Sequence, residues 1–155
     1  MNPLIAAHLH LVLSHIPVAA IVFGAGLLGW GAWASSRDIQ KAALGLFVLA
    51  ALAAVPSYLT GEPAAATIKG LPGFSERILE QHQSAAGMAL GGCVVVGLLA
   101  LAGLVLFRGS ALSVRFGLLM AAGVLLAGGL ALRTAFLGGQ IRHAEIRPAE
   151  TQAEP

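Results

Sequence analysis

Charged side chains are scarce in this sequence. Asp, Glu, Lys and Arg together make up 10% of its 155 residues, whereas apolar residues make up 57%. A soluble domain carries about 25% charged residues because its surface faces water. The composition therefore excludes an ordinary soluble domain and indicates an integral membrane protein. A net charge of +2 without any run of basic residues also argues against nucleic-acid binding.

Cysteine is nearly absent as well. The single Cys93 lies inside an apolar run, which excludes an internal disulfide and any metal or iron–sulfur site built from several cysteines. The sequence lacks a Cys-x-x-Cys-His motif, so covalently attached haem is also excluded. No nucleophile, base and orienting acid occur at a spacing suited to hydrolysis. These absences favour an electron-transfer or accessory subunit over a stand-alone enzyme.

Four apolar stretches are present, and each is close to the ~20 residues that span the hydrocarbon core of a bilayer. No Lys or Arg precedes Arg37, so the first stretch lacks the basic start of a cleaved signal peptide and is expected to be retained. Asn2 and Ser75 are suitable N-caps for the first and third helices. No convincing internal repeat is visible. The expected all-α fold is a transmembrane four-helix bundle over residues 1–147, with helices at about 4–34, 41–60, 76–107 and 111–141 and a disordered tail at 148–155.

The orientation of this bundle is predicted from the basic residues of its short loops, which favour the cytoplasm. The two tight turns lie on one side of the membrane, and both termini lie on the other. The termini are therefore expected in the periplasm. The basic residues of the tight turns are Arg37, Lys41, Arg108 and Arg115.

The histidines gather on the side of the termini, because the odd helices begin there and the even helices end there. Counted from the basic residues of the tight turns at 1.5 Å per helical residue, three of them come within roughly 3 Å of one height, and two further groups lie about 7 Å deeper. The level histidines are His10, His82 and His143; the deeper groups are His15 and Glu62; His8 lies slightly higher.

Imidazoles from different helices can clamp a haem in a four-helix bundle. The first hypothesis is therefore b-type haem bound by His82 with His10 or His15, with His143 next in order, in an electron-transfer protein. Arg133 or Arg142 would neutralise the propionates. The partners expected on this hypothesis are a periplasmic redox protein, a quinone or a larger respiratory complex.

Two alternatives remain open. Three histidines with Glu62 could instead hold copper or zinc. The chain could also bind no cofactor and act as an accessory subunit that docks on other membrane subunits through Gly and Ala faces. In that case the histidines are structural: His8 lies at the interface, and His15 lies beside the kink at Pro17.

Several separated motifs of the chain are distinctive. They are HLVLSHIP (10–17), YLTGEPA (58–64), LPG (71–73) with EQHQSA (80–85), and GGQIRHAEIR (138–147). With these motifs the chain resembles uncharacterised four-helix proteins of the bacterial inner membrane, which are known only as a domain of unknown function. The resemblance covers nearly the whole chain and implies the fold and the location, but no activity. Members typically have His-Glu where this chain has His82 and Gln83.

Overall fold

The computed structural model describes residues 2–148, apart from the side chain of Pro3. Within these residues the chain forms four long helices and no strand, which confirms the predicted all-α, four-helix fold. Each helix is long and apolar enough to cross a membrane. Residues 149–155, which make up most of the tail expected to be disordered, lie outside the described part. The elements are α1 (Pro3–Trp33), α2 (Arg37–Ala65), α3 (Glu76–Leu106), α4 (Val114–Gln140) and the short 3-10 helix η1 (Ala144–Ile146).

Every long helix begins at a polar residue whose side chain accepts a hydrogen bond from a backbone N–H of the first turn. Asn2 and Ser75 have this role, as expected from the sequence. Ser36 caps α2, which therefore starts earlier than the predicted residue 41 and continues through Pro63, past the predicted end at residue 60. This extension carries residues 61–65 on the helix.

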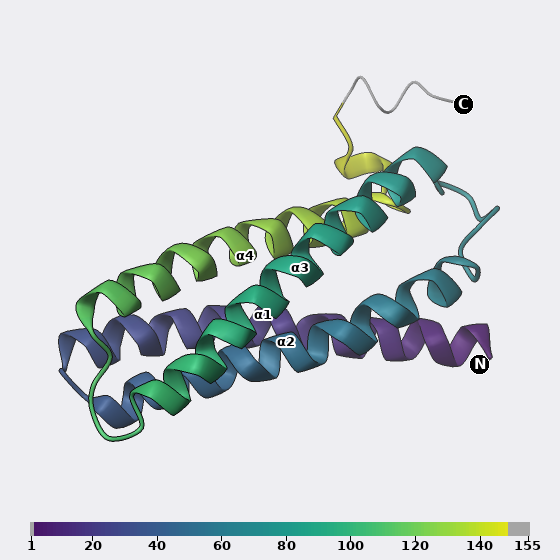
Figure 1. Ribbon diagram of the computed structural model, residues 1–155. Coiled ribbons are helices and arrows are strands. Elements are labelled where there is room, and N and C mark those ends of the chain that lie inside the picture. The colour runs from purple at the N-terminus through teal and green to yellow at the C-terminus, as the bar shows by residue number, and fades with distance from the viewer. Residues whose placement is uncertain (1, 149–155) are drawn as a thin grey trace.

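The helices pack in the order of the chain, each against the next (Figure 1). The seam between α4 and α1, which would complete the ring, is the least closed. At one end of the bundle α1 and α3 begin and α2 and α4 end. We call it the histidine end (residues 2–15, 57–85 and 134–148). The opposite end is called the turn end and comprises the two tight connections (residues 34–41 and 107–115).

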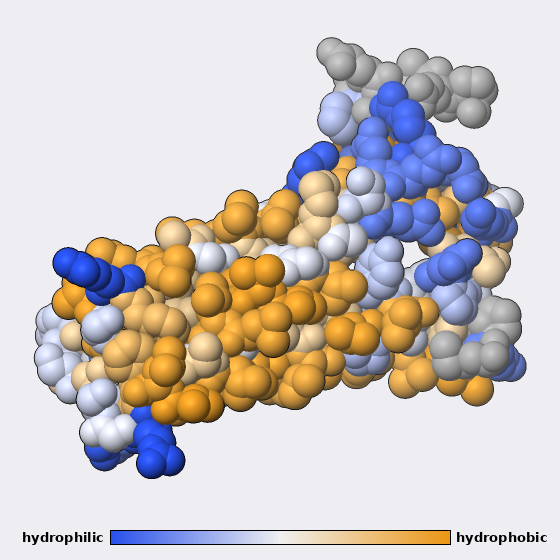
Figure 2. Space-filling model, viewed as in Figure 1, coloured by the Kyte–Doolittle hydropathy of each residue, from blue (hydrophilic) through white to orange (hydrophobic). Residues whose placement is uncertain are grey.

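The core lies between all four helices and is centred on Phe47, Leu44 and Met120, which are fully buried. Glycine allows close packing there, because a Cβ placed on Gly24 would lie only 2.5 Å from the Phe47 ring. Many large apolar side chains point outward instead, and the long sides of the bundle are apolar (Figure 2). Such an outer surface is suited to lipid rather than to water.

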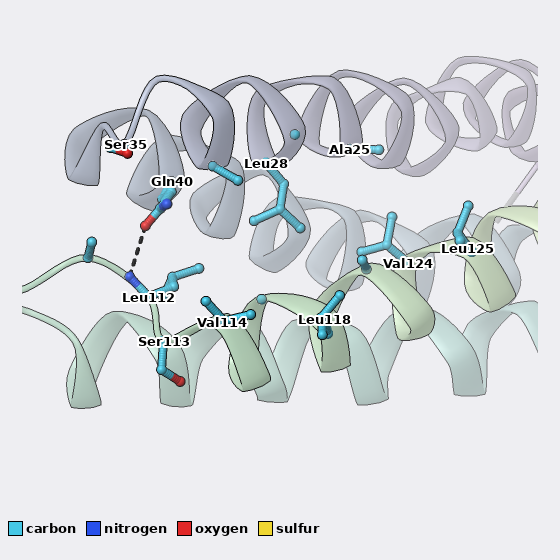
Figure 3. Close-up of a pocket in the computed structure, with 15 residues that line it drawn as sticks. Ala25, Leu28, Ser35, Gln40, Leu112, Ser113, Val114, Leu118, Val124 and Leu125 are labelled. Atoms are coloured by element: carbon cyan, nitrogen blue, oxygen red, sulfur yellow. Dashed lines mark hydrogen bonds between the residues drawn. The ribbon is translucent and has the colours of Figure 1, made fainter.

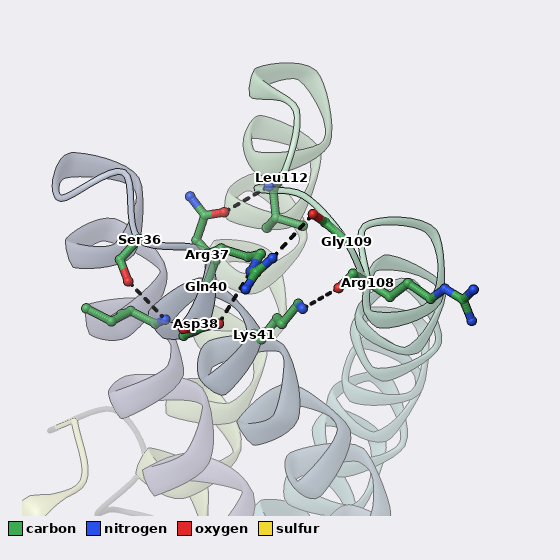
Figure 4. A network of polar contacts seen from close by, with 9 residues as sticks. Ser36, Arg37, Asp38, Gln40, Lys41, Arg108, Gly109 and Leu112 are labelled. Atoms are coloured by element: carbon green, nitrogen blue, oxygen red, sulfur yellow. Dashed lines mark hydrogen bonds and ion pairs between the residues drawn. The ribbon is translucent and has the colours of Figure 1, made fainter.

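At the turn end, the first turn of α2 holds both tight connections in place (Figure 4). Gln40 is buried; its Nε2 donates to the Gly31 carbonyl at 3.2 Å, and its Oε1 accepts from the Leu112 N–H at 2.8 Å. Both halves of this amide are therefore satisfied by backbone groups, one in the last turn of α1 and one in the second connection. Two basic side chains of the same turn donate to carbonyls of the second connection: Arg37 to Gly109 at 3.3 Å and Lys41 to Arg108 at 2.5 Å.

The histidine end has a small apolar cluster of its own. Beside it, the segment after α4 is held by hydrogen bonds to the α2–α3 connection and to the end of α4. The N–H of Ser75 donates to the Ile141 carbonyl at 3.1 Å. Arg147 donates to the carbonyls of Gln140 at 2.8 Å, Ile141 at 2.9 Å and Gly73. These bonds join the α2–α3 connection to the end of α4. The buried cluster consists of Ala65, Ile78, Leu79 and Ile141, with Ile68 and Phe74 against it.

Candidate functional site

Polar residues concentrate at the histidine end, above all where α3 begins and α4 ends (Figure 2). The same view shows the surface hollowed there, between the part formed by α3 and α4 and the part formed by α1 and α2. The bundle therefore opens at the end that carries the histidines.

His10 reaches from α1 to the backbone of α2. Its half-buried ring places Nδ1 2.9 Å from the Ser57 carbonyl oxygen. A carbonyl only accepts hydrogen bonds, so Nδ1 carries the proton and Nε2 keeps its lone pair. The hydroxyl oxygen of Thr60 lies 3.4 Å from the same Nδ1. Gly61 leaves the space for this ring, because a Cβ at that position would lie 3.4 Å from His10 Cε1.

His82 makes the same contact between α3 and α4. Its half-buried Nδ1 lies 2.9 Å from the Thr134 carbonyl oxygen, so Nε2 is again the nitrogen with the lone pair. A Cβ on Gly138 would lie 3.1 Å from His82 Cε1, which makes a glycine the best fit beside the ring. The Thr134 hydroxyl donates to the Leu130 carbonyl at 2.9 Å and does not compete for the imidazole.

These two contacts belong to a repeat that sequence analysis missed. In α2 and in α4 the residue whose carbonyl accepts the bond stands four positions before the glycine. The number of residues from the N-cap to this accepting residue is also equal in the two helices, from Ser36 to Ser57 in α2 and from Ser113 to Thr134 in α4. The two hairpins are also alike at the turn end. A Cβ on Gly31 would meet Ile39, the third residue after the cap Ser36, and a Cβ on Gly103 would meet Phe116, the third residue after the cap Ser113. The hairpins α1–α2 and α3–α4 are therefore built alike, each with one histidine bound to a carbonyl of its partner helix.

His10 and His82 stand at the same end of the bundle, and the charge of His10 acts on His82. The pair thus supplies two imidazoles, each oriented by a backbone carbonyl and each with a lone pair on Nε2. This is the state in which histidine binds a metal, because the bond from Nδ1 fixes the tautomer and raises the basicity of the other nitrogen.

His15 and His8 do not take part in a contact between helices. His15 is exposed, and its Nδ1 lies 2.5 Å from the Leu11 carbonyl of its own helix, one turn back. His8 is exposed in the same way and bonds to Leu4 at 2.8 Å. Of the two α1 histidines considered for a site with His82, His10 is the one that contacts another helix.

The residue count that set a level for His143 does not apply to the structure. Its predicted height assumed that the helix continues to residue 143, but α4 ends at Gln140 and the chain then turns. His143 is exposed, and its Nδ1 lies 2.7 Å from Glu145 Oε1. The pKa of the Glu145 carboxyl is lowered, first by a hydrogen bond from its own backbone N–H and then by the bond from His143.

Glu62 and Arg133 are both exposed on the helix surface. Glu62 belongs to the extended end of α2, and Arg133 directly precedes the carbonyl partner of His82. Within residues 2–148 no three His, Cys, Asp or Glu side chains come together as a group that could hold a metal ion. The alternative of three histidines with Glu62 around copper or zinc therefore gains no support from the structure.

Sequence reasoning overlooked the residues that orient the imidazoles. Ser57, Thr134 and the glycines after them receive no role in the sequence analysis, although a Ser/Thr-x-x-x-Gly pattern at the same place in both hairpins marks them. Gln140 was overlooked too. It is 2% exposed, and its Nε2 has no hydrogen-bond partner in the described part of the chain. A buried donor of this kind is normally satisfied.

The fold and the site define a four-helix protein with membrane-length apolar helices and a carbonyl-oriented pair of histidines at one end. Comparison of the chain with protein-family models, with curated proteins and with solved structures found no match. What the pair does is therefore argued from its chemistry.

Proposed function

We propose that this chain is a small electron-transfer protein of the bacterial inner membrane that binds b-type haem between His10 and His82. Its four helices cross the membrane, with the histidine end in the periplasm and the basic turn end in the cytoplasm. A periplasmic redox protein, a quinone or the subunits of a larger membrane complex would exchange electrons with it.

The observation that carries the proposal is the shared state of the two rings. Each imidazole donates through Nδ1 to a carbonyl of the neighbouring helix, at 2.9 Å in both cases, and each keeps Nε2 for a ligand. Two neutral imidazoles from separate helices are a donor set that suits haem iron. A site for zinc or copper normally needs a third ligand, and no such group occurs within residues 2–148.

The chain's own residues would position and tune the cofactor. The carbonyls of Ser57 and Thr134 hold the rings against rotation and make Nε2 more basic. Gly61 and Gly138 leave room for the rings beside the helices. Arg133 or Arg142 would neutralise the propionates near the membrane surface. When bound, the haem would supply one-electron chemistry at a potential set by its axial ligands and their hydrogen bonds.

The test is the visible spectrum of the protein purified in detergent, with metal content measured on the same sample. We expect a sharp Soret band that shifts on reduction with dithionite. His10→Ala and His82→Ala should each abolish this low-spin spectrum. His8→Ala is the matched control, because His8 is exposed on the same helix and bonds only to its own turn, and it should leave the spectrum unchanged.

Two results would overturn the proposal. A colourless protein with stoichiometric copper or zinc would favour the metal site, and a colourless protein without metal would favour the accessory subunit. Circular dichroism of each variant establishes that a lost spectrum reflects a lost ligand rather than a lost fold.

A further inference from the structure

An apolar groove runs along the seam between α1 and α4. Its part nearer the turn end has a volume of about 540 Å³, within the range of small-molecule sites. A second part of about 350 Å³ extends it toward the histidine end, and the two parts share Ala25, Val124 and Leu125. Figure 3 shows Leu28 of α1 and Val124 of α4 pointing into the larger part.

The repeat makes this groove unexpected. In the repeat, α1 corresponds to α3 and α2 corresponds to α4. The seam between α2 and α3 is therefore equivalent to the seam between α4 and α1. At α2–α3 the helices touch, since a Cβ on Gly97 would overlap the Cβ of Ala51. By the spacing of the repeat, the counterparts of this pair are Ala25 and Gly128, and both line the open groove. Side chains small enough for contact are thus present on both walls, yet the seam stays open.

The charge at one end of the groove indicates what fits it. At the turn end the groove is bordered by Ser35, Gln40 and Ser113. The two connections there contain four basic residues and a single acid, Asp38. The Arg108 side chain extends away from the polar network (Figure 4), and Arg115 is exposed in the first turn of α4, next to the groove-lining Val114. An apolar channel that ends at such a cluster complements a molecule with a long hydrocarbon chain and an anionic head.

We propose that an anionic phospholipid binds in the α1–α4 groove. One acyl chain lies between Ala25 and Gly128 and fills this seam, which stays open although its small side chains would allow the two helices to touch. The phosphate lies at the turn end, where the exposed Arg115 beside the groove attracts it. Basic residues at the membrane surface bind anionic headgroups in this way, each with a modest contribution. This site is independent of the haem proposal, because it lies on another seam and toward the opposite end of the bundle.

The experiment measures lipid retained by the detergent-purified protein after incubation with phosphatidylglycerol or with phosphatidylcholine of the same acyl chains, read by native mass spectrometry. The expected result is one tightly held phosphatidylglycerol per chain, retained about tenfold better than phosphatidylcholine. Arg115→Gln should lower this preference about fivefold. Lys69→Gln, at the histidine end, is the charge control and should leave it unchanged.

Groove-filling variants test the position of the acyl chain. Gly29→Leu and Gly117→Leu add a side chain within the groove, where a Cβ meets no atom within 4 Å, so the fold has room for them. Each should reduce retained phosphatidylglycerol to the level of phosphatidylcholine. Gly91→Leu is the matched control, because Gly91 is equally open but lies on α3, away from the groove.

Three outcomes would overturn the proposal. The first is equal retention of the two lipids by the natural protein. The second is unchanged retention by both groove-filling variants. The third is a dimer mass that disappears in these variants, which would assign the groove to a second copy of the chain instead.

Discussion

The two ends of the bundle use their polar groups in different ways. At the turn end, the Gln40 amide donates to the Gly31 carbonyl of α1 and accepts from the Leu112 N–H of the second connection, so both of its polar atoms are satisfied within the protein. At the histidine end, each imidazole of the pair uses one nitrogen to bind a carbonyl and keeps the other, and the Gln140 Nε2 has no partner among residues 2–148. Complete satisfaction is typical of a structural network, whereas oriented groups with remaining capacity are typical of a binding site.

Among the changes that test this difference between the two ends, the largest effect is expected for a substitution beside His82. Gly138→Leu places a side chain where even a Cβ would lie 3.1 Å from the ring. It should turn the imidazole away from Thr134 and lower haem affinity at least about tenfold, as loss of an orienting partner does. Haem bound per folded protein is the measurement.

Gly139→Leu is the matched control for this change. A Cβ on Gly139 would meet only Ile146 Cδ1, at 3.6 Å, so haem binding should stay near that of the natural protein. Equal losses in the two variants would mean that any bulk at the end of α4 is harmful, and the role given to Gly138 would be wrong.

A second prediction concerns stability at the turn end. Gln40→Met removes both hydrogen bonds and leaves the Leu112 N–H without its partner, while the Gly31 carbonyl keeps only its bond from the Ser36 N–H, at 2.9 Å. The expected cost is about 2 kcal/mol in the free energy of unfolding, because unsatisfied buried groups are expensive. Unfolding in mixed detergent micelles measures it. Gln81→Met, at an exposed position of α3, is the control and should change stability little.

The same substitution at Gln140 sharpens the contrast. Because its Nε2 has no partner to lose, Gln140→Met should cost less than about 1 kcal/mol and so less than the change at Gln40. A larger loss would show that the Gln140 amide is part of the structural network, and the difference drawn between the two ends would then not hold for it.

The smallest effect is expected beyond α4, where the pKa of Glu145 lies below its ordinary value of 4.5 because its own backbone N–H and His143 favour the carboxylate. A lowered carboxyl pKa contributes stability that is present above 4.5 and is lost as pH falls through the lowered value. His143→Ala should raise the pKa of Glu145 part of the way toward its ordinary value. Carbon-detected NMR of the Glu145 carboxyl is the measurement. The haem spectrum should not change, and a change would return His143 to the site.

Much of the fold could be predicted from the sequence, because length and hydropathy decide how many helices cross a bilayer. The crossings also place His10 and His82 at the same end. The height of His143 could not be predicted in this way, because residue counting assumes an unbroken helix and α4 ends three residues before it. Ser57 and Thr134 act through their backbone carbonyls, which every residue has, so the only sequence signal for them is the Ser/Thr-x-x-x-Gly pattern shared by the two hairpins.

The repeat escaped notice for a related reason. The number of residues between His10 and His82 differs from the number between Ser57 and Thr134, because the connections within the two hairpins differ in length. A single offset along the sequence therefore does not align both helices of a pair. The equivalence becomes visible in the structure, where His10 and His82 make the same contact with the partner helix.

The sequence by itself determined four apolar helices, their caps and the gathering of imidazoles at one end, because these depend on composition, on local hydrogen bonding and on an even number of crossings. The tertiary structure decided which histidine meets which carbonyl and which seam of the bundle stays open. Those outcomes depend on how each helix is rotated about its axis, and the rotation is set by contacts such as Gly24 against Phe47 and Gly97 against Ala51, which form only when all four helices pack together.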